Sequence, residues 1–137
     1  MKASIDLKWV GNMSFETQLN GHKLVLDASP EVGGENKGPR PKPLMMVALA
    51  GCTGMDVVSL LKKMRVDIEG VNIKVEGDIT EDHPKHFTRM KIIYEFTGNN
   101  LDIEKLEKAV NMSKEQYCGV SASYAKAMEL THEIRIA

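Results

Sequence analysis

A long apolar segment in the first half of the chain constrains the fold more than any other feature. It runs from Leu44 to about Met64, in the stretch LMMVALAGCTGMDVVSLLKKM. This run is too long for one strand and holds few strand-forming residues before Val57, so it predicts a buried helix. Gly51 and Gly54 weaken such a helix, and we attribute them to the close approach of another backbone. We therefore expect a fold built around one buried helix.

A loop rich in glycine and proline precedes this helix. Residues 27–43, DASPEVGGENKGPRPKP, have no apolar period. Loops of this length inside a small domain are usually functional or mobile. A minor alternative takes GGENKGPR as a phosphate-binding loop, because glycine-rich backbone amides can hold an anion. The segment lacks the GK[ST] order of such loops, which argues against this alternative.

Three strands are expected before the loop. Apolar and polar residues alternate over residues 3–9 and 13–19, which is the period of a half-buried strand. Asn20-Gly21 is the strongest two-residue hairpin signal and predicts a turn into a third strand. Between the first two strands we expect a three-residue loop that pairs Trp9 with Met13, so that apolar residues face one another.

The second half of the chain predicts two further strands, two helices and a last strand. The two strands lie near residues 71–75 and 90–96 and should be antiparallel neighbours. A helix near residues 103–110, with Asn99 and Asn100 as candidate caps, and a short helix after Cys118 precede a strand at residues 128–136. This order of elements predicts an α+β fold, with residues 1–137 forming a single domain.

The charge balance and the N-terminus exclude several classes of protein. The 137 residues carry 18 basic and 19 acidic side chains, so we expect no nucleic-acid partner. The N-terminal residues MKASIDLKWV do not resemble a secretion signal, and no segment reaches the roughly 18 uninterrupted apolar residues of a membrane span. We expect a soluble, cytoplasmic protein without a membrane partner.

Two cysteines, Cys52 and Cys118, lie 66 positions apart. They form no CxxC pair and have no companion histidine at a ligand spacing, and His83 and His86 belong to a polar turn, so we expect no metal site. A stabilising disulfide is not expected in a reducing compartment. Spacing alone leaves two alternatives, two inert buried thiols or a redox pair, and favours the inert thiols.

The two thiols differ in their predicted surroundings. Cys118 lies where a helix should begin, and unpaired amides at such a position favour a thiolate. Cys52 lies in an apolar helix, where burial opposes ionisation, so its reactivity requires a positive partner. Arg40 and Lys42 are the nearest cations in the sequence, and Arg40 is the better candidate because its guanidinium stays charged. The alternative is that Arg40 is an ordinary solvated loop residue.

The stretch PRPKPLMMVALAGC, followed by CGVS, resembles the OsmC/Ohr family of osmotically inducible and organic hydroperoxide resistance proteins. In that family a proline lies eleven positions before a helical cysteine, a spacing that Pro41 and Cys52 match. A second family cysteine lies in a CPVS-like motif, where this chain has Gly119 in place of proline after Cys118. The resemblance covers nearly the whole chain, and GPRP with the residues around the first thiol most resembles the YhfA-like branch.

The resemblance implies a thiol peroxidase. Cys52 would attack an organic hydroperoxide and become a sulfenic acid, Cys118 would resolve it into a disulfide, and an external dithiol would reduce the disulfide without any cofactor. The resemblance also implies an OsmC-like fold, with antiparallel sheets around a buried central helix, in an intertwined homodimer. The alternative function is an OsmC-like protein that binds an apolar ligand without peroxidase turnover.

The chain departs from the family at the residues that activate the thiol. The best-characterised members use an arginine from the N-terminal strands and a glutamate just after the proline. Residues 1–39 contain no arginine, and Lys42 takes the position of the glutamate. The resemblance therefore assigns the family roles to the two cysteines but not to the activating residues, and we expect Arg40 to replace the family arginine.

Overall fold

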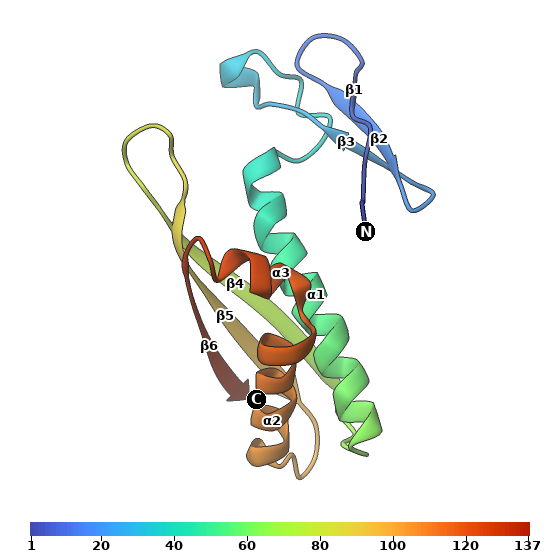
Figure 1. Ribbon diagram of the computed structural model, residues 1–137, viewed down its shortest axis with the longest axis vertical. Helices are drawn as coiled ribbons and strands as arrows, with labels where there is room; N and C mark the ends of the chain where they lie inside the picture. Colours follow the sequence, from blue (N-terminus) through green and yellow to red (C-terminus); the bar gives the residue numbers. More distant parts are fainter. The chain divides into compact units, whose positions relative to one another are not determined.

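The computed structural model of the protein describes residues 1–137. The chain divides into two units, residues 1–45 and residues 46–137 (Figure 1). Its elements follow the predicted order of three strands, a long loop, a helix, two strands, helical turns and a last strand. The α+β class is therefore confirmed, while the prediction of a single domain stays a prediction.

The first unit contains an antiparallel sheet of β1 (Lys8–Trp9), β2 (Phe15–Leu19) and β3 (His22–Leu26), in that order. Asn20 and Gly21 both have positive φ, 52° and 82°, and the turn pairs Leu19 with His22. The Asn-Gly hairpin is thus confirmed, because a two-residue turn of this hand needs left-handed backbone at both central positions.

The predicted register of the first hairpin is wrong by two residues. Trp9 pairs with Phe15 instead of Met13. Gly11 and Asn12 take left-handed φ values of 109° and 49°, and the N–H of Val10 donates to the carbonyl of Ser14, so the connection holds five residues. Trp9 still lies opposite an apolar residue, which is why periodicity could not distinguish the two registers.

The loop that follows β3 is organised by the carboxylate of Asp27. One oxygen accepts the N–H of Ala28 at 2.7 Å, and the other accepts the N–H groups of Glu35 and Lys37 at 3.1 and 3.0 Å. These hydrogen bonds, that of Lys37 first, lower the pKa of Asp27. The amides that could have held a phosphate bind a carboxylate of the chain itself, so the phosphate-loop alternative is wrong. The same loop contains a short 3₁₀ turn, η1 (Pro30–Val32).

The apolar run forms α1 (Pro41–Lys63), which begins three residues earlier than predicted. Proline is tolerated in the first turn of a helix because the N–H groups there have no intrahelical acceptor. The helix buries a single stripe of residues spaced four apart: Leu49, Thr53, Val57 and Leu61. Met55 on another side is 78% exposed, so the expected burial applies to one face only. By length and composition α1 could also cross a membrane, a test that core helices of soluble proteins pass as well.

The second unit contains a sheet of β4 (Gly70–Ile79), β5 (Phe87–Thr97) and β6 (Glu129–Ile136), with β5 in the centre. β4 and β5 are antiparallel as predicted, with Val71 opposite Phe96. β6 runs parallel to β5, with Ile92 opposite His132. The expectation of wholly antiparallel sheets is therefore wrong for this sheet. A helical crossover precedes β6, and such crossovers are the connections that parallel neighbours require.

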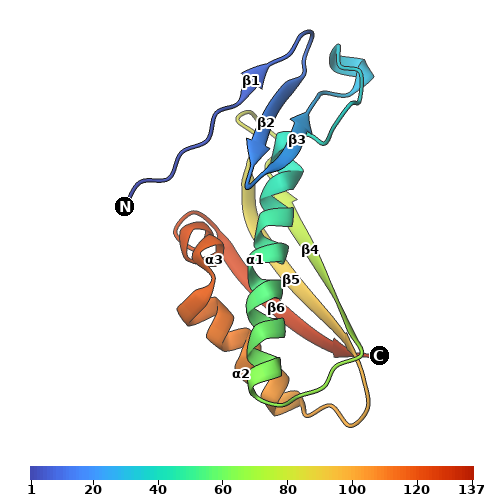
Figure 2. The ribbon, with the colours of Figure 1, turned by 90° about the vertical axis from the view of Figure 1, so that its right-hand side faces the viewer.

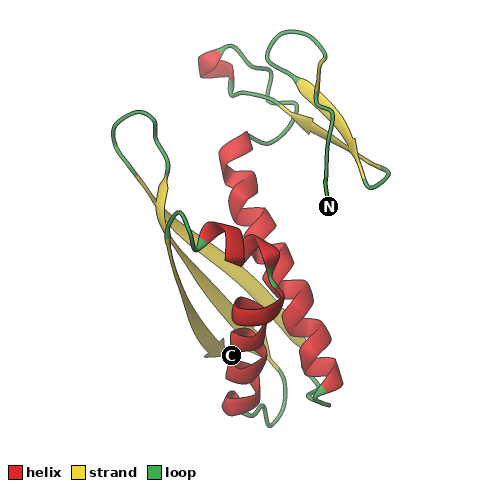
Figure 3. Ribbon diagram, in the orientation of Figure 1, coloured by secondary structure: helices red, strands yellow, loops and turns green.

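The crossover consists of α2 (Ile103–Met112), a π-helical turn η2 (Ser113–Tyr117) and α3 (Gly119–Tyr124). Asp102, not Asn99 or Asn100, caps α2, because its side chain accepts the N–H of Glu104 at 3.0 Å. Two views at right angles place α1, α2 and α3 on the same face of the sheet (Figures 2 and 3). The core of the unit lies in this layer and includes residues that are at most 1% exposed: Leu49, Val57, Leu61, Met90, Tyr94, Phe96, Leu106 and Val110.

The two glycines of α1 have different surroundings. A Cβ at Gly54 would lie 2.7 Å from Cδ1 of Ile73 on β4, so a larger residue there would require the end of the Ile73 side chain to shift. The close neighbour is a side chain and not the expected backbone. A Cβ at Gly51 would meet nothing within 4 Å, so the expectation of a close approach is wrong at that glycine.

Candidate functional site

The fold brings together the two cysteines that lie 66 positions apart in the sequence. The sulfur atoms of Cys52 and Cys118 and a carboxylate oxygen of Asp56 all lie within 4.8 Å of one another. Cys52 and Asp56 are four residues apart on α1, so both side chains leave the same face of the helix. Cys118 comes from the crossover that lies on the same side of the sheet. A disulfide between Cys52 and Cys118 would require the two sulfurs to approach to about 2.05 Å.

Cys118 occupies the N-cap of α3, as the sequence predicts. Its sulfur accepts the N–H of Ser121 at 3.3 Å. Its own N–H donates to the carbonyl of Ser113 at 2.7 Å, which is the five-residue hydrogen bond that closes the π turn. The side chain is 2% exposed. The π turn and the start of α3 together hold this sulfur against α1.

Cys52 is half-buried, and its surroundings disfavour the thiolate. Burial is the main cause that raises the pKa of this thiol, and its hydrogen bond with Cys118 is the next. The charges of Cys118 and Asp56 raise the pKa further, while the N–H of Val120 donates to the sulfur and opposes the rise. The predicted direction for a thiol in an apolar helix is thus confirmed.

A chain of buried hydroxyl groups leads from the sheet to Asp56. The hydroxyl of Ser113 donates to the Asp56 carboxylate at 3.0 Å. Because that proton is used, Ser113 must accept from Thr53, 3.1 Å away, and Thr53 must accept from the hydroxyl of Tyr94, 2.6 Å away. Burial raises the pKa of Tyr94 to about 12, so the phenol keeps its proton. These hydroxyl groups hold the carboxylate of Asp56, an oxygen of which lies within 4.8 Å of the two sulfurs.

Sequence reasoning did not identify Asp56, Thr53 or Ser113. The signal that was available is the position of Asp56, which is the one charged side chain between Leu44 and Leu61 and lies one turn after Cys52. A carboxylate in such a run is either solvated or held by partners that periodicity cannot locate.

Arg40 lies in the loop of the first unit. Its Nη1 donates to Oδ1 of Asn36 at 2.5 Å and to the carbonyl of Gly38 at 3.1 Å. These contacts hold the side chain to its own loop, and the expected action of Arg40 on Cys52 stays a prediction. Lys42, the other candidate cation, is exposed in the first turn of α1.

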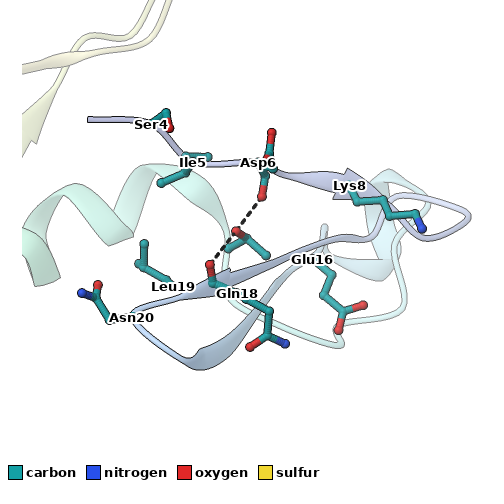
Figure 4. A pocket seen from close by; sticks show the side chains of 9 residues that line it. Ser4, Ile5, Asp6, Lys8, Glu16, Gln18, Leu19 and Asn20 are labelled. Atoms are coloured by element: carbon teal, nitrogen blue, oxygen red, sulfur yellow. Dashed lines mark hydrogen bonds between the residues drawn. The ribbon is translucent and has the colours of Figure 1, made fainter. Parts of the chain in front are cut away.

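The first unit also contains two hollows. One has a volume of about 380 Å³ and a largely apolar lining that includes Leu7, Phe15, Leu26 and Arg40. The other, of about 580 Å³, lies beside β2 and has a mixed lining in which the hydroxyl of Thr17 donates to the carbonyl of Asp6 at 2.6 Å (Figure 4). Neither hollow contains a cysteine, so the cysteine pair is the candidate for chemistry.

Comparisons with known proteins agree with these features. Residues 34–133 match the model of the OsmC-like protein family. The chain is 30% identical over 131 residues to protein YhfA of Escherichia coli strain K12, covering 95% of each chain. A hypothetical protein from Aquifex aeolicus shares the fold with a TM-score of 0.86 at 28% identity, over 100% of this chain and 98% of that one. The organic hydroperoxide resistance protein OhrB of Bacillus subtilis has the same fold at 17% identity, with a TM-score of 0.68 over 98% of both chains. The protein belongs to the OsmC-like protein family.

Proposed function

We propose that the protein is a thiol-dependent peroxidase that reduces organic hydroperoxides at Cys52. The observation that supports this most directly is the meeting of Cys52 and Cys118 with their sulfurs within 4.8 Å. Two free thiols at this separation in a reducing cytoplasm, where we place the protein, are suited to reversible oxidation. Members of the fold that are named organic hydroperoxide resistance proteins support the choice of substrate.

The proposed reaction has two steps at the protein. The Cys52 thiolate attacks the distal oxygen of the hydroperoxide, the O–O bond breaks, and the alkoxide takes a proton and leaves as an alcohol. The Cys118 thiolate then attacks the sulfur of the Cys52 sulfenic acid, and hydroxide leaves as water with a proton. The resulting disulfide is reduced by an external dithiol, which supplies two electrons and two protons.

The difference in exposure supports the proposed division of roles. Cys52 is half-buried while Cys118 is 2% exposed, so peroxide reaches Cys52 more readily. The apolar residues of α1 around Cys52 favour an alkyl hydroperoxide over hydrogen peroxide. Since burial and Asp56 raise the pKa of Cys52, the proposal requires a cation at the sulfur, and Arg40 is our candidate.

The test is stoichiometric oxidation of the reduced protein. One equivalent of cumene hydroperoxide should remove two hydrogens from the intact mass and form the Cys52–Cys118 disulfide. Cys118→Ser should instead accumulate a sulfenic acid that over-oxidises with excess peroxide, and Cys52→Ser should leave the peroxide unchanged. Turnover with cumene hydroperoxide and with hydrogen peroxide should then be compared, using dihydrolipoamide, thioredoxin and glutathione as reductants.

The outcome decides between this proposal and a binding function. If Cys52→Ser consumes peroxide at the parent rate, the assignment of roles is wrong. If peroxide oxidises neither thiol of the parent, the alternative is that the protein binds an apolar ligand. The apolar hollow of about 380 Å³ in the first unit favours that alternative.

A further inference from the structure

We propose that Cys52, Asp56 and Cys118 bind one zinc ion in the reduced protein. Their ligand atoms all lie within 4.8 Å of one another. In a tetrahedral zinc site two sulfurs lie about 3.8 Å apart, because each Zn–S bond is about 2.3 Å long. The two sulfurs therefore need to approach by at most about 1 Å, and each sulfur and the carboxylate oxygen by at most about 1.3 Å. Small side-chain rotations produce movements of this size.

The ligand set suits zinc better than other common divalent ions. Two thiolates and one carboxylate are ligands that zinc accepts, whereas magnesium and calcium prefer oxygen alone. Three protein ligands leave the fourth tetrahedral position to water, which is the arrangement of an open zinc site. Spacing in the sequence argued against a metal because neither cysteine had a companion ligand. The fold supplies that companion in Asp56, one helical turn after Cys52.

Each proposed ligand already has the outer hydrogen bond that metal ligands require. The N–H of Val120 donates to the sulfur of Cys52, and the N–H of Ser121 donates to that of Cys118 at 3.3 Å. The hydroxyl of Ser113 donates to one carboxylate oxygen of Asp56 at 3.0 Å. Such partners orient metal ligands and stabilise their charged forms.

The local charge also favours a cation at this position. When zinc is bound, the two thiolates and the carboxylate carry three negative charges, which the doubly charged ion largely offsets. An ion can reach the carboxylate through a hollow of about 190 Å³ that Asp56 lines together with Ser59, Leu60, Lys63 and Tyr117. The site thus has ligands, outer hydrogen bonds and an access route.

Zinc and a disulfide exclude one another, because both use the same sulfur electron pairs. Binding releases one proton from each thiol. Oxidation of the zinc form by one hydroperoxide consumes two protons and yields the disulfide, an alcohol, water and free zinc. This regulatory consequence rests on the proposed peroxidase function, whereas zinc binding itself does not. Zinc would protect the resting thiols, and peroxide would release it.

The test uses the full chain, reduced and free of metal, under anaerobic conditions. Cobalt should bind with one ion per chain and produce thiolate-to-cobalt absorption, and zinc should displace it. Affinity for zinc is measured by competition with a chromophoric chelator. Asp56→Asn should lower the affinity at least about 10-fold, and Ser113→Ala about 10-fold, in line with losses at outer-shell partners of metal sites.

The controls separate a built site from incidental thiol binding. Cys52→Ser and Cys118→Ser should each abolish the cobalt absorption. Asp67→Asn removes an exposed carboxylate just after α1 and should bind like the parent. Circular dichroism and the unfolding midpoint establish that each variant is folded.

Two results would overturn the proposal: no cobalt absorption in the parent, or unchanged zinc affinity in folded Asp56→Asn. Neither result depends on peroxide. Oxidation by cumene hydroperoxide without zinc binding would leave the peroxidase proposal standing, and zinc binding without oxidation would leave the metal proposal standing.

Discussion

Replacement of Thr53 by valine tests the buried hydroxyl chain that supports the site. Thr53 is 1% exposed, and its hydroxyl lies 2.6 Å from the hydroxyl of Tyr94 and 3.1 Å from that of Ser113. Valine has nearly the same shape, so the variant removes hydrogen bonds with little change in packing. Ser113 still donates to Asp56 in the variant, but Tyr94 loses its acceptor in a dry core.

The expected loss of unfolding free energy arises because the Tyr94 hydroxyl is left without a hydrogen-bond acceptor. A buried donor without an acceptor costs about 1–3 kcal/mol of unfolding free energy. For a domain of this size each kcal/mol lowers Tm by about 4 °C, so Tm should fall by about 4–12 °C. Urea unfolding of the reduced protein at neutral pH gives the free energy, and an unchanged m-value establishes that the unfolded state is comparable.

A double-mutant cycle separates the hydrogen bond from other effects. Tyr94→Phe alone should cost less than Thr53→Val, because Thr53 keeps its bond with Ser113. The double variant Thr53→Val/Tyr94→Phe should be more stable than the sum of the single losses predicts, since it no longer has a Tyr94 hydroxyl without an acceptor. If the unfolding free energy of Thr53→Val lies within about 0.5 kcal/mol of that of the parent, the hydroxyl chain does not stabilise the core and our account of it is wrong.

Four further predictions concern the thiol, the loop and the assembly. Arg40→Met should raise the pH at which Cys52 is alkylated, and an unmoved profile would assign the cation to another residue. Asp56→Asn should shift the same profile to lower pH, because the charge of Asp56 helps to raise the pKa of Cys52. Asp27→Asn should lower stability at neutral pH and flatten its fall in acid, measured as urea midpoints from pH 6 to pH 2. The pKa of Asp27 is below its ordinary value of 3.8 in the folded state, so its stabilisation is full above that value and is lost as the pH falls through the folded pKa. Sedimentation at micromolar concentration should show the homodimer that the family resemblance implies, and a monomer would remove that inference.

Most of the fold could be predicted because its signals are local. The alternation in β4 and β5 and the Asn-Gly turn at residues 20–21 each depend on neighbouring residues. The first hairpin was harder, because two registers give Trp9 an apolar partner and only the left-handed Gly11-Asn12 pair decides between them. The direction of β6 was not predictable, because alternation is the same in parallel and antiparallel strands.

The candidate site was predicted less completely. Resemblance, and not spacing, identified Cys52 and Cys118 as a pair, and the structure places their sulfurs together. Asp56 was missed because its partner Ser113 lies 57 positions away, on a segment whose π geometry has no clear sequence signal. Local sequence patterns and motifs do not predict where Arg40 lies relative to the Cys52 thiol.

The π turn at Ser113–Tyr117 makes the length of this segment critical. Each residue of a helix turns the chain by about 100°, so deleting one residue there would restore an α-helix and rotate everything that follows by that angle. Cys118 and the amides of α3 would then face away from Cys52, although no functional side chain had been removed. We therefore expect natural insertions and deletions to avoid residues 113–117. They should be tolerated in the exposed loop near residues 80–86, because the number of residues in that loop does not affect the site.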